Sequence, residues 1–310
     1  MGKSDEPDEP VGTPEDATRT PGGGGPMNDS PNTPGAAPAT HAPADRKGRQ
    51  LTGERPQEGV TPDSLLALHA AGYRTVIERL GQGSVLDVGC GQGFESARFL
   101  GPDRRVVGVD YSAEAVDLAR SNYGDAGLEV AQMNALALGF DQGGFDWACS
   151  SHLIEHFDEP EGHVAELARV VADDGTVFFL TPNAPADFEN PFHIHLFEPP
   201  ELRSLLTKYF HDVTIQGLDA VPHVKADFTA RRVKAEKVLR LDFLDLRHKI
   251  PRAWYVGFYA WVLPKAYRLI ARGDAGGSTG ITADDFFVTD DLDATTMVLF
   301  ATASRPRRTV

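Results

Sequence analysis

Residues 84–93 read SVLDVGCGQG, a short apolar run that ends in three closely spaced glycines. The run SVLDV has the apolar, partly β-branched composition of a buried strand. Glycines directly after a strand permit a sharp turn and let a ligand approach the main chain closely. Residues 84–93 therefore predict a strand followed by a ligand-binding turn.

Strand and helix patterns then alternate along the chain. The candidate strands are 84–88, 105–110, 128–133, 145–150 and 176–182, and the candidate helices are 94–100, 112–123 and 160–172. This alternation indicates βαβ units and a parallel sheet. Sheets of this kind bind ligands at the carboxyl ends of their strands. We therefore expect the functional residues in the loops that directly follow the strands.

Beyond residue 183 the pattern predicts one more helix, at 199–210, and two more strands, at 212–218 and 294–303. The segment between these strands, 219–293, is predicted to be a helical insertion. Its part 225–272 carries twelve Lys or Arg against four Asp or Glu and contains the stretch WYVGFYAW. We expect a lid over the ligand edge, and the alternatives are contact with a membrane surface and an oligomer interface.

Composition sets limits on the class of protein. The first 60 residues hold ten Pro, ten Gly and no Phe, Tyr or Trp, so we expect a disordered tail at 1–58 and a folded domain at 59–310. A formal charge of −15 argues against nucleic acid as a partner. With only two cysteines, we expect no disulfide framework, which suits a cytoplasmic protein. The sequence has no run of 18 apolar residues, so we expect no membrane-spanning helix.

Two further residues refine the ligand. Asp110 ends the second strand, 21 residues after Gly89, where an acidic side chain can accept both hydroxyls of a ribose. Phe94 stands where a turn that binds a dinucleotide pyrophosphate needs Gly or Ala, so that the helix can pack closely against the strand. The turn and Asp110 together predict a ligand that has a ribose and no pyrophosphate.

These motifs, taken in order, resemble the class I S-adenosylmethionine-dependent methyltransferases. The stretches that carry the resemblance are VLDVGCGQG, VVGVDYSAEAVDLAR, FDWACSSHLIEHFDEP and ELARVVADDGTVFFLTPN. The resemblance covers about 60–218 and 294–303. It implies an α/β, doubly wound, Rossmann-like sheet of seven strands in the order 3-2-1-4-5-7-6, with the seventh strand antiparallel and an insertion between strands 6 and 7.

The resemblance also implies roles in binding S-adenosylmethionine. Asp87 orients the turn, Asp110 holds the ribose, and Tyr111 packs on the adenine. Asn134 stands where the family usually has Asp bound to the adenine amino group. The remaining cofactor-binding candidates line the methionine part or follow strands 3 and 4: Gly89, Gly91, Gly93, Met133, Ala135, Ser150 and Ser151.

The stretch HLIEH, 152–156, admits three interpretations. On a helix, two histidines four apart with a glutamate between them are typical of zinc proteases. Here the stretch follows a strand at the ligand edge, so we expect no zinc bound through it. The Glu155-His156 pair matches a pair that follows the fourth strand in many methyltransferases, which favours a floor between cofactor and acceptor. The third interpretation is that His152 and His156 only cap and pack the loop.

The acceptor side is expected at NPFHIHLFEPPEL, 190–202. His156, His193 and His195 are the candidate catalytic bases, because imidazole titrates near neutral pH. A purely structural role and metal binding by His193 with His195 remain alternatives. The predicted activity is methylation of a small molecule or glycan, with oxygen favoured over nitrogen as the acceptor atom. A non-catalytic S-adenosylmethionine binder is the competing class, and the oligomeric state is left open.

Overall fold

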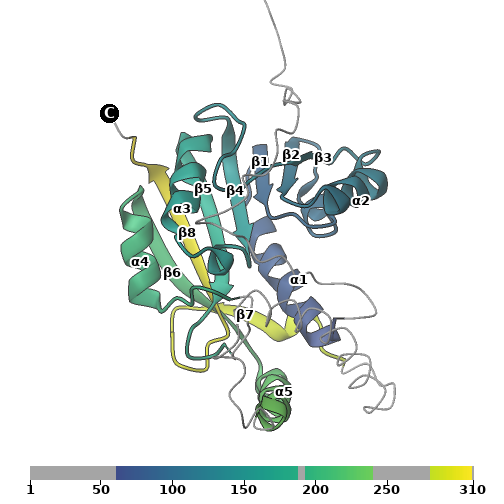
Figure 1. Cartoon of the computed structure of the whole chain (residues 1–310), viewed down its shortest axis with the longest axis vertical. Coiled ribbons are helices and arrows are strands. Elements are labelled where there is room, and N and C mark those ends of the chain that lie inside the picture. Colours follow the sequence, from purple (N-terminus) through teal and green to yellow (C-terminus); the bar gives the residue numbers. More distant parts are fainter. Residues whose placement is uncertain (1–60, 188–192, 240–279, 309–310) are drawn as a thin grey trace, which may run out of the picture. The chain divides into compact units, whose positions relative to one another are not determined.

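The computed structural model describes residues 61–187, 193–239 and 280–308 (Figure 1). The predicted tail at 1–58 lies outside these residues. So does most of the predicted insertion, including the aromatic stretch 254–261.

Eight strands form one sheet in the order β3-β2-β1-β4-β5-β8-β6-β7 (Figure 1). Their bounds are β1 Gly83–Val88, β2 Arg104–Asp110, β3 Glu129–Gln132, β4 Phe145–Ser151, β5 Val171–Pro182, β6 Phe210–Ala220, β7 Phe286–Thr289 and β8 Val298–Pro306. Strands β1 to β5 pair in parallel, and β8 is antiparallel to both β5 and β6. The predicted order 3-2-1-4-5-7-6 is therefore confirmed, with β8 as the expected antiparallel strand and β7 added at the edge.

Helices pack against both faces of this sheet, with α1 in one core and α3 and α4 in the other. The α-helices of the described residues are α1 Asp63–Ile77, α2 Ala113–Tyr123, α3 Glu161–Val170, α4 Pro199–Thr207 and α5 Pro222–Leu239. Neighbouring residues of one strand enter different cores, because side chains alternate across a sheet. Phe178 joins the core that contains α1 residues, whereas Phe179 joins the core formed with α3 and α4. The sheet is thus doubly wound, as predicted.

Two predicted helical segments differ from the structure. Residues 94–100 form only a 3₁₀ turn, Ser96–Phe99, because the Ser96 hydroxyl is drawn inward to the buried carboxylate of Asp87 and Pro102 follows closely. The insertion is also not wholly helical. It begins with α5 but then contributes β7, which pairs antiparallel with β6. The apolar run FFVT at 286–289 is a strand signal that the prediction overlooked.

The predicted helix at 112–123 is confirmed together with its cap. The Ser112 side chain accepts a hydrogen bond from the backbone N–H of Ala115 at 3.3 Å, and α2 begins with Ala113, the residue after Ser112.

Within the described part of the chain, no helix combines the length and apolar character needed to cross a membrane.

Candidate functional site

The glycine turn after β1 is held against β2. The N–H groups of Gly89 and Cys90 donate to the carbonyl of Val109 at 2.8 and 3.0 Å. Gly91 has a φ of 55°, and a Cβ built on it would have no atom within 4 Å. Gly93 has a φ of 79° and lies against α2, where an added Cβ would come within 2.9 Å of Ala119. The turn therefore packs on α2 at one point and opens to free space at another.

Asp110 lies buried beside this open space. Its Oδ2 accepts from the N–H of Gly91 at 3.0 Å and its Oδ1 from the N–H of Ser112 at 2.8 Å. A carboxylate has about four acceptor positions, so acceptor capacity remains for a ligand's hydroxyls. Tyr111 is 42% exposed. The structure gathers six residues from the loops after β1 to β4 around one small hollow: Gly89, Asp110, Tyr111, Met133, Ala135 and Leu153.

Asp87 supports the turn from below. It is fully buried and accepts hydrogen bonds from the hydroxyls of Ser96 and Tyr73, the latter at 3.2 to 3.3 Å. Burial raises the pKa of Asp87 from its ordinary 3.8 to about 7, against the lowering effect of the two hydroxyls. Tyr73 comes from α1, which the sequence analysis missed, although its apolar residues recur at helical spacing. Asp87 is thus a supporting residue without direct exposure to a ligand.

Asn134 and Ser150 already have partners within the protein. The side-chain oxygen of Asn134, an exposed residue, accepts from the N–H of Leu136 at 3.0 Å and closes a local turn. His163 donates from Nδ1 to the carbonyl of Ala135 at 3.1 Å, so its Nε2 accepts from the Ser150 hydroxyl at 2.9 Å. Burial lowers the pKa of His163 from 6.5 to about 4. The Ser150 hydroxyl is thus directed to a neutral imidazole behind the strand.

Ser151 differs from its neighbour. Its hydroxyl is buried at the end of β4, and the described residues give it no hydrogen-bond partner. A buried polar group without a partner costs free energy, and such groups often await a ligand. Ser151 therefore stays a candidate for ligand contact through its side chain.

The HLIEH stretch does not form an α-helix. Only Ile154–His156 make a 3₁₀ turn. His152 adopts a φ of 51°, in the left-handed region, and its ring packs against that of His69 from α1 with the centroids 4.4 Å apart. The helical face that a zinc-protease motif requires is absent, because His152 turns toward α1.

Glu155 lies fully buried between these histidines. Its Oε2 accepts from the Thr181 hydroxyl at 3.0 Å, and its Oε1 lies 3.4 Å from Nδ1 of His152. Burial alone would raise the pKa of Glu155. The close approach of His152 and the charges of His156, His152 and His193 outweigh burial and lower the pKa to about 2. The side chain is thus held as a carboxylate.

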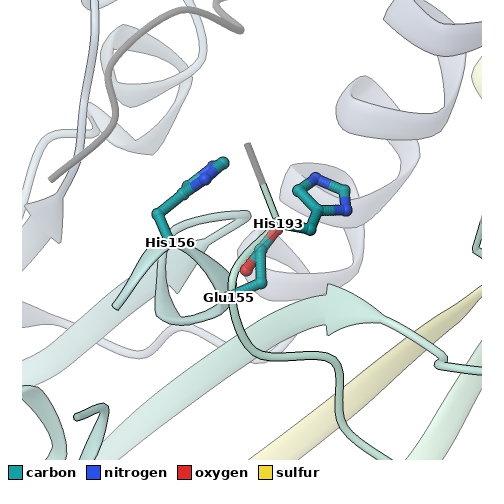
Figure 2. A group of neighbouring side chains, drawn as sticks. All are labelled: Glu155, His156 and His193. Atoms are coloured by element: carbon teal, nitrogen blue, oxygen red, sulfur yellow. The ribbon is translucent and has the colours of Figure 1, made fainter. Parts of the chain in front are cut away.

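The segment after β5 is fastened to this loop by its backbone. The N–H groups of Ile194 and His195 donate to the carbonyl of Glu155 at 2.8 and 3.0 Å. The ring of His193 consequently lies 5.4 Å from that of His156, and Figure 2 shows both imidazoles on either side of the Glu155 carboxylate. The structure therefore brings two of the three predicted bases together at Glu155.

His195 takes a different position from His193. Its Nε2 pairs with Glu201 at 2.8 Å, and its ring packs on Phe197. His156 and His195 both line a cavity of about 740 Å³ between the loop after β4, the start of α3, and α4. Its other lining residues include Phe157, Asp158, Glu159, Glu161, Phe197 and Lys208. A cavity of this volume is in the range of small-molecule sites.

Known proteins resemble this chain in sequence and in fold. Residues 86–179 match the methyltransferase domain family. A probable S-adenosylmethionine-dependent methyltransferase of Mycobacterium tuberculosis is 32% identical over 189 residues, which cover 58% of this chain and 68% of that protein. A ubiquinone biosynthesis O-methyltransferase of Aromatoleum aromaticum is 35% identical over 102 residues, 32% of this chain and 44% of the relative. A solved methyltransferase of Thermotoga maritima matches with a TM-score of 0.50 at 14% identity, over 78% of this chain and 91% of its own.

The doubly wound sheet with its antiparallel strand, together with the glycine turn, defines a Rossmann-like methyltransferase fold. The chain belongs to the S-adenosylmethionine-dependent methyltransferases. It is an enzyme, and S-adenosylmethionine is its cofactor. The residues present fit this cofactor, since the turn is open at Gly91, Asp110 retains acceptor capacity, and the Ser151 hydroxyl lacks a protein partner.

Proposed function

We propose that this enzyme methylates a hydroxyl group of a small molecule or glycan. The observation that supports this most strongly is the cavity of about 740 Å³ with His156 and His195 in its wall. The cavity and the cofactor hollow both include loops that follow β3 and β4, so acceptor and cofactor meet at one edge of the sheet.

The cofactor half of the proposal assigns roles to individual residues. When bound, S-adenosylmethionine supplies an electrophilic methyl group on a sulfonium. Asp110 accepts the ribose hydroxyls, Tyr111 covers the adenine, and Ser151 faces the methionine end. Met133 and Ala135 form the wall of the hollow, and Gly89, Gly91 and Gly93 form the turn. Asp87, Asn134 and Ser150 act by supporting the neighbouring loops, because their polar atoms bind within the protein.

The acceptor half needs a base and a fixed geometry. The acceptor oxygen forms its bond to the methyl carbon while its proton passes to an imidazole of the cavity wall. The bonding pair of the broken bond stays on sulfur, and S-adenosylhomocysteine leaves. A positioned imidazole contributes about 10² to 10⁴ in rate to a proton transfer of this kind. The chain's residues thus supply the base and orient the acceptor for an in-line displacement.

The charged residues in the cavity wall narrow the class of acceptor further. The cavity wall carries four carboxylates, Asp158, Glu159, Glu161 and Glu201, against one lysine, Lys208, which is paired with Glu161. An anionic acceptor would be repelled there, so a neutral hydroxyl compound is favoured. The name of the Aromatoleum relative, an O-methyltransferase, supports oxygen as the acceptor atom.

Both cysteines are buried thiols, which suits a cytoplasmic enzyme.

The test uses matched pairs of acceptors that differ only in a hydroxyl or an amine, such as phenols with anilines and sugars with amino sugars. Release of S-adenosylhomocysteine and mass spectrometry of the product give the readout. We expect methylated hydroxyl products and a loss of at least about tenfold in kcat for His156→Ala or His195→Ala. Methylation of amines alone would replace the proposal by N-methylation. Cofactor binding without any release across the panel and across a cell extract would favour a non-catalytic binder.

A further inference from the structure

One carboxylate and two imidazoles converge between the loop after β4 and the segment after β5. Each of Glu155, His156 and His193 offers one ligand atom, and these atoms all lie within 4.8 Å of one another (Figure 2). We propose that Glu155, His156 and His193 form a binding site for one divalent transition-metal ion, with zinc the favoured ion. This donor set differs from the two histidines of HLIEH and from the pair His193 with His195.

The residues around the three donors support this assignment. Nδ1 of His193 donates to Asp187 at 2.8 Å, which leaves the lone pair on Nε2. Thr181 fixes the Glu155 carboxylate by its hydroxyl. Metal-binding histidines almost always donate their second ring N–H to a carboxylate or carbonyl, and metal-binding carboxylates are themselves hydrogen-bonded. Glu155 and His193 therefore already have the partners that a metal ligand needs.

The second oxygen of the carboxylate gives a separate argument. Glu155 is fully buried, and Thr181 donates to its Oε2, whereas its Oε1 is buried without a hydrogen-bond partner among the described residues. A buried acceptor without a partner costs free energy, which a bound ligand at that atom would offset. Two imidazole nitrogens beside one carboxylate oxygen favour zinc over Mg²⁺, which prefers oxygen ligands alone.

The geometry needs a small contraction. Tetrahedral zinc at ~2.1 Å from its ligands places the donor atoms about 3.4 Å apart. The separation of up to 4.8 Å closes by rotation of the imidazoles of His156 and His193. Two histidines and a glutamate leave a fourth position open, as in catalytic zinc sites. His156 also lines the acceptor cavity, so this position is accessible from the cavity.

The role of the ion rests on the proposed function. An acceptor hydroxyl bound at the open position would lose its proton more readily, because a metal ion lowers the pKa of a bound oxygen. His156 and His193 would then act as ligands. His195, the other imidazole of the cavity wall, would remain for the proton. The metal site would thus make an oxygen acceptor reactive near neutral pH.

The experiment measures metal binding without an acceptor. Full-length protein is stripped with a chelator and titrated with Co²⁺, whose visible absorption reports a nitrogen- and oxygen-ligated site of low coordination number. Zinc competition then gives the zinc affinity. We expect one ion per chain. Glu155→Gln, His156→Ala and His193→Ala should each lower the affinity for zinc by at least about tenfold. Asp187→Asn should lower this affinity by about tenfold, because the substitution removes the partner of His193.

His195→Ala is the matched control, since His195 lies two residues from the donor His193, outside the donor set, and its Nε2 pairs with Glu201. It should keep zinc affinity within about twofold. Circular dichroism and melting curves check the fold of each variant, and the half-buried His193 keeps the test valid if Glu155→Gln does not fold. No Co²⁺ spectrum in the wild type, or unchanged affinity in His193→Ala, would overturn the proposal. So would loss of the ion in His195→Ala.

Cofactor affinity, measured by calorimetry on the same stripped samples, separates the two proposals. Normal S-adenosylmethionine binding with no metal binding would overturn the metal site and leave the proposed function in place. Metal binding with hydroxyl methylation that is equal in stripped and zinc-loaded protein would overturn the role of the ion. Metal binding with methylation of amines alone would overturn the proposed function and keep the site.

Discussion

The two halves of the sheet edge are built in opposite ways. In the cofactor half, Asp110 is held by hydrogen bonds from backbone N–H groups of the adjacent turn and helix start. In the histidine half, Glu155 depends on Thr181 and on histidines, one of which lies beyond β5. The first half is therefore largely formed by local sequence, whereas the second exists only once distant segments meet. The contrast teaches that a motif predicts a backbone-lined site better than a site made of side chains.

The largest expected effect concerns Asp87, in the cofactor half. Its pKa is raised from 3.8 to about 7, so its contribution to stability is present below pH 3.8 and is lost as the pH rises through 7. The free energy of unfolding of the wild type should therefore fall by about 4 kcal/mol relative to Asp87→Asn between pH 4 and pH 8. Urea unfolding at both pH values measures the difference. A difference that does not vary with pH would contradict the prediction.

His163 in the histidine half should behave in the opposite way. Its pKa is lowered from 6.5 to about 4, so the folded state loses stability as the pH falls from 6.5 to 4. The loss should reach about 3 kcal/mol at pH 4 relative to His163→Gln. Unfolding curves at pH 4 and pH 7 test this. Because Asp87 and His163 act in opposite directions over this window, each wild-type slope has to be read against its own variant.

Substitutions of Gly93 and Gly91 distinguish the part of the turn that packs on α2 from the part that faces the space for the ligand. Gly93→Ala should destabilise by about 2 to 3 kcal/mol, since the left-handed backbone costs 1 to 2 and the new Cβ presses on Ala119 of α2. Gly91→Ala carries the backbone cost alone, about 1 kcal/mol, because its Cβ meets nothing. Gly91→Ala should instead weaken the binding of S-adenosylmethionine. Equal melting temperatures with equal cofactor affinities in the two variants would refute the distinction.

The last expected effect is on cofactor binding. Asp110→Ala should weaken the binding of S-adenosylmethionine by at least about 1.5 kcal/mol, because the ribose hydroxyls and two backbone N–H groups lose their acceptor. Isothermal titration calorimetry measures the change. Asp117→Ala, an exposed carboxylate on α2 paired with Arg120, is the control and should bind normally. Equal affinity in Asp110→Ala and the wild type would remove Asp110 from the cofactor site.

Sequence patterns predicted most strands, and the resemblance to the methyltransferase family implied their order, but the patterns failed where a distant contact decides the local structure. The segment 94–100 has helical spacing and yet forms a 3₁₀ turn, because Ser96 bonds to Asp87 in the neighbouring strand. Ser150 lies near the carboxyl end of β4, where cofactor ligands are expected, but its hydroxyl bonds to His163 on α3. Strand β7 is different, since the run FFVT at 286–289 carries a strand signal that the prediction overlooked; only its pairing with β6 depends on residues far apart in the chain.

The sequence by itself determined the cofactor half of this protein: the strand, the glycine turn and Asp110 lie within 27 residues and act mainly through backbone geometry. The tertiary structure alone decided the histidine half. His193 reaches Glu155 through the hydrogen bonds that the N–H groups of Ile194 and His195 donate to the Glu155 carbonyl. Periodicity and composition report which face of an element is apolar. They do not report which side chains meet, because that depends on how separate elements pack.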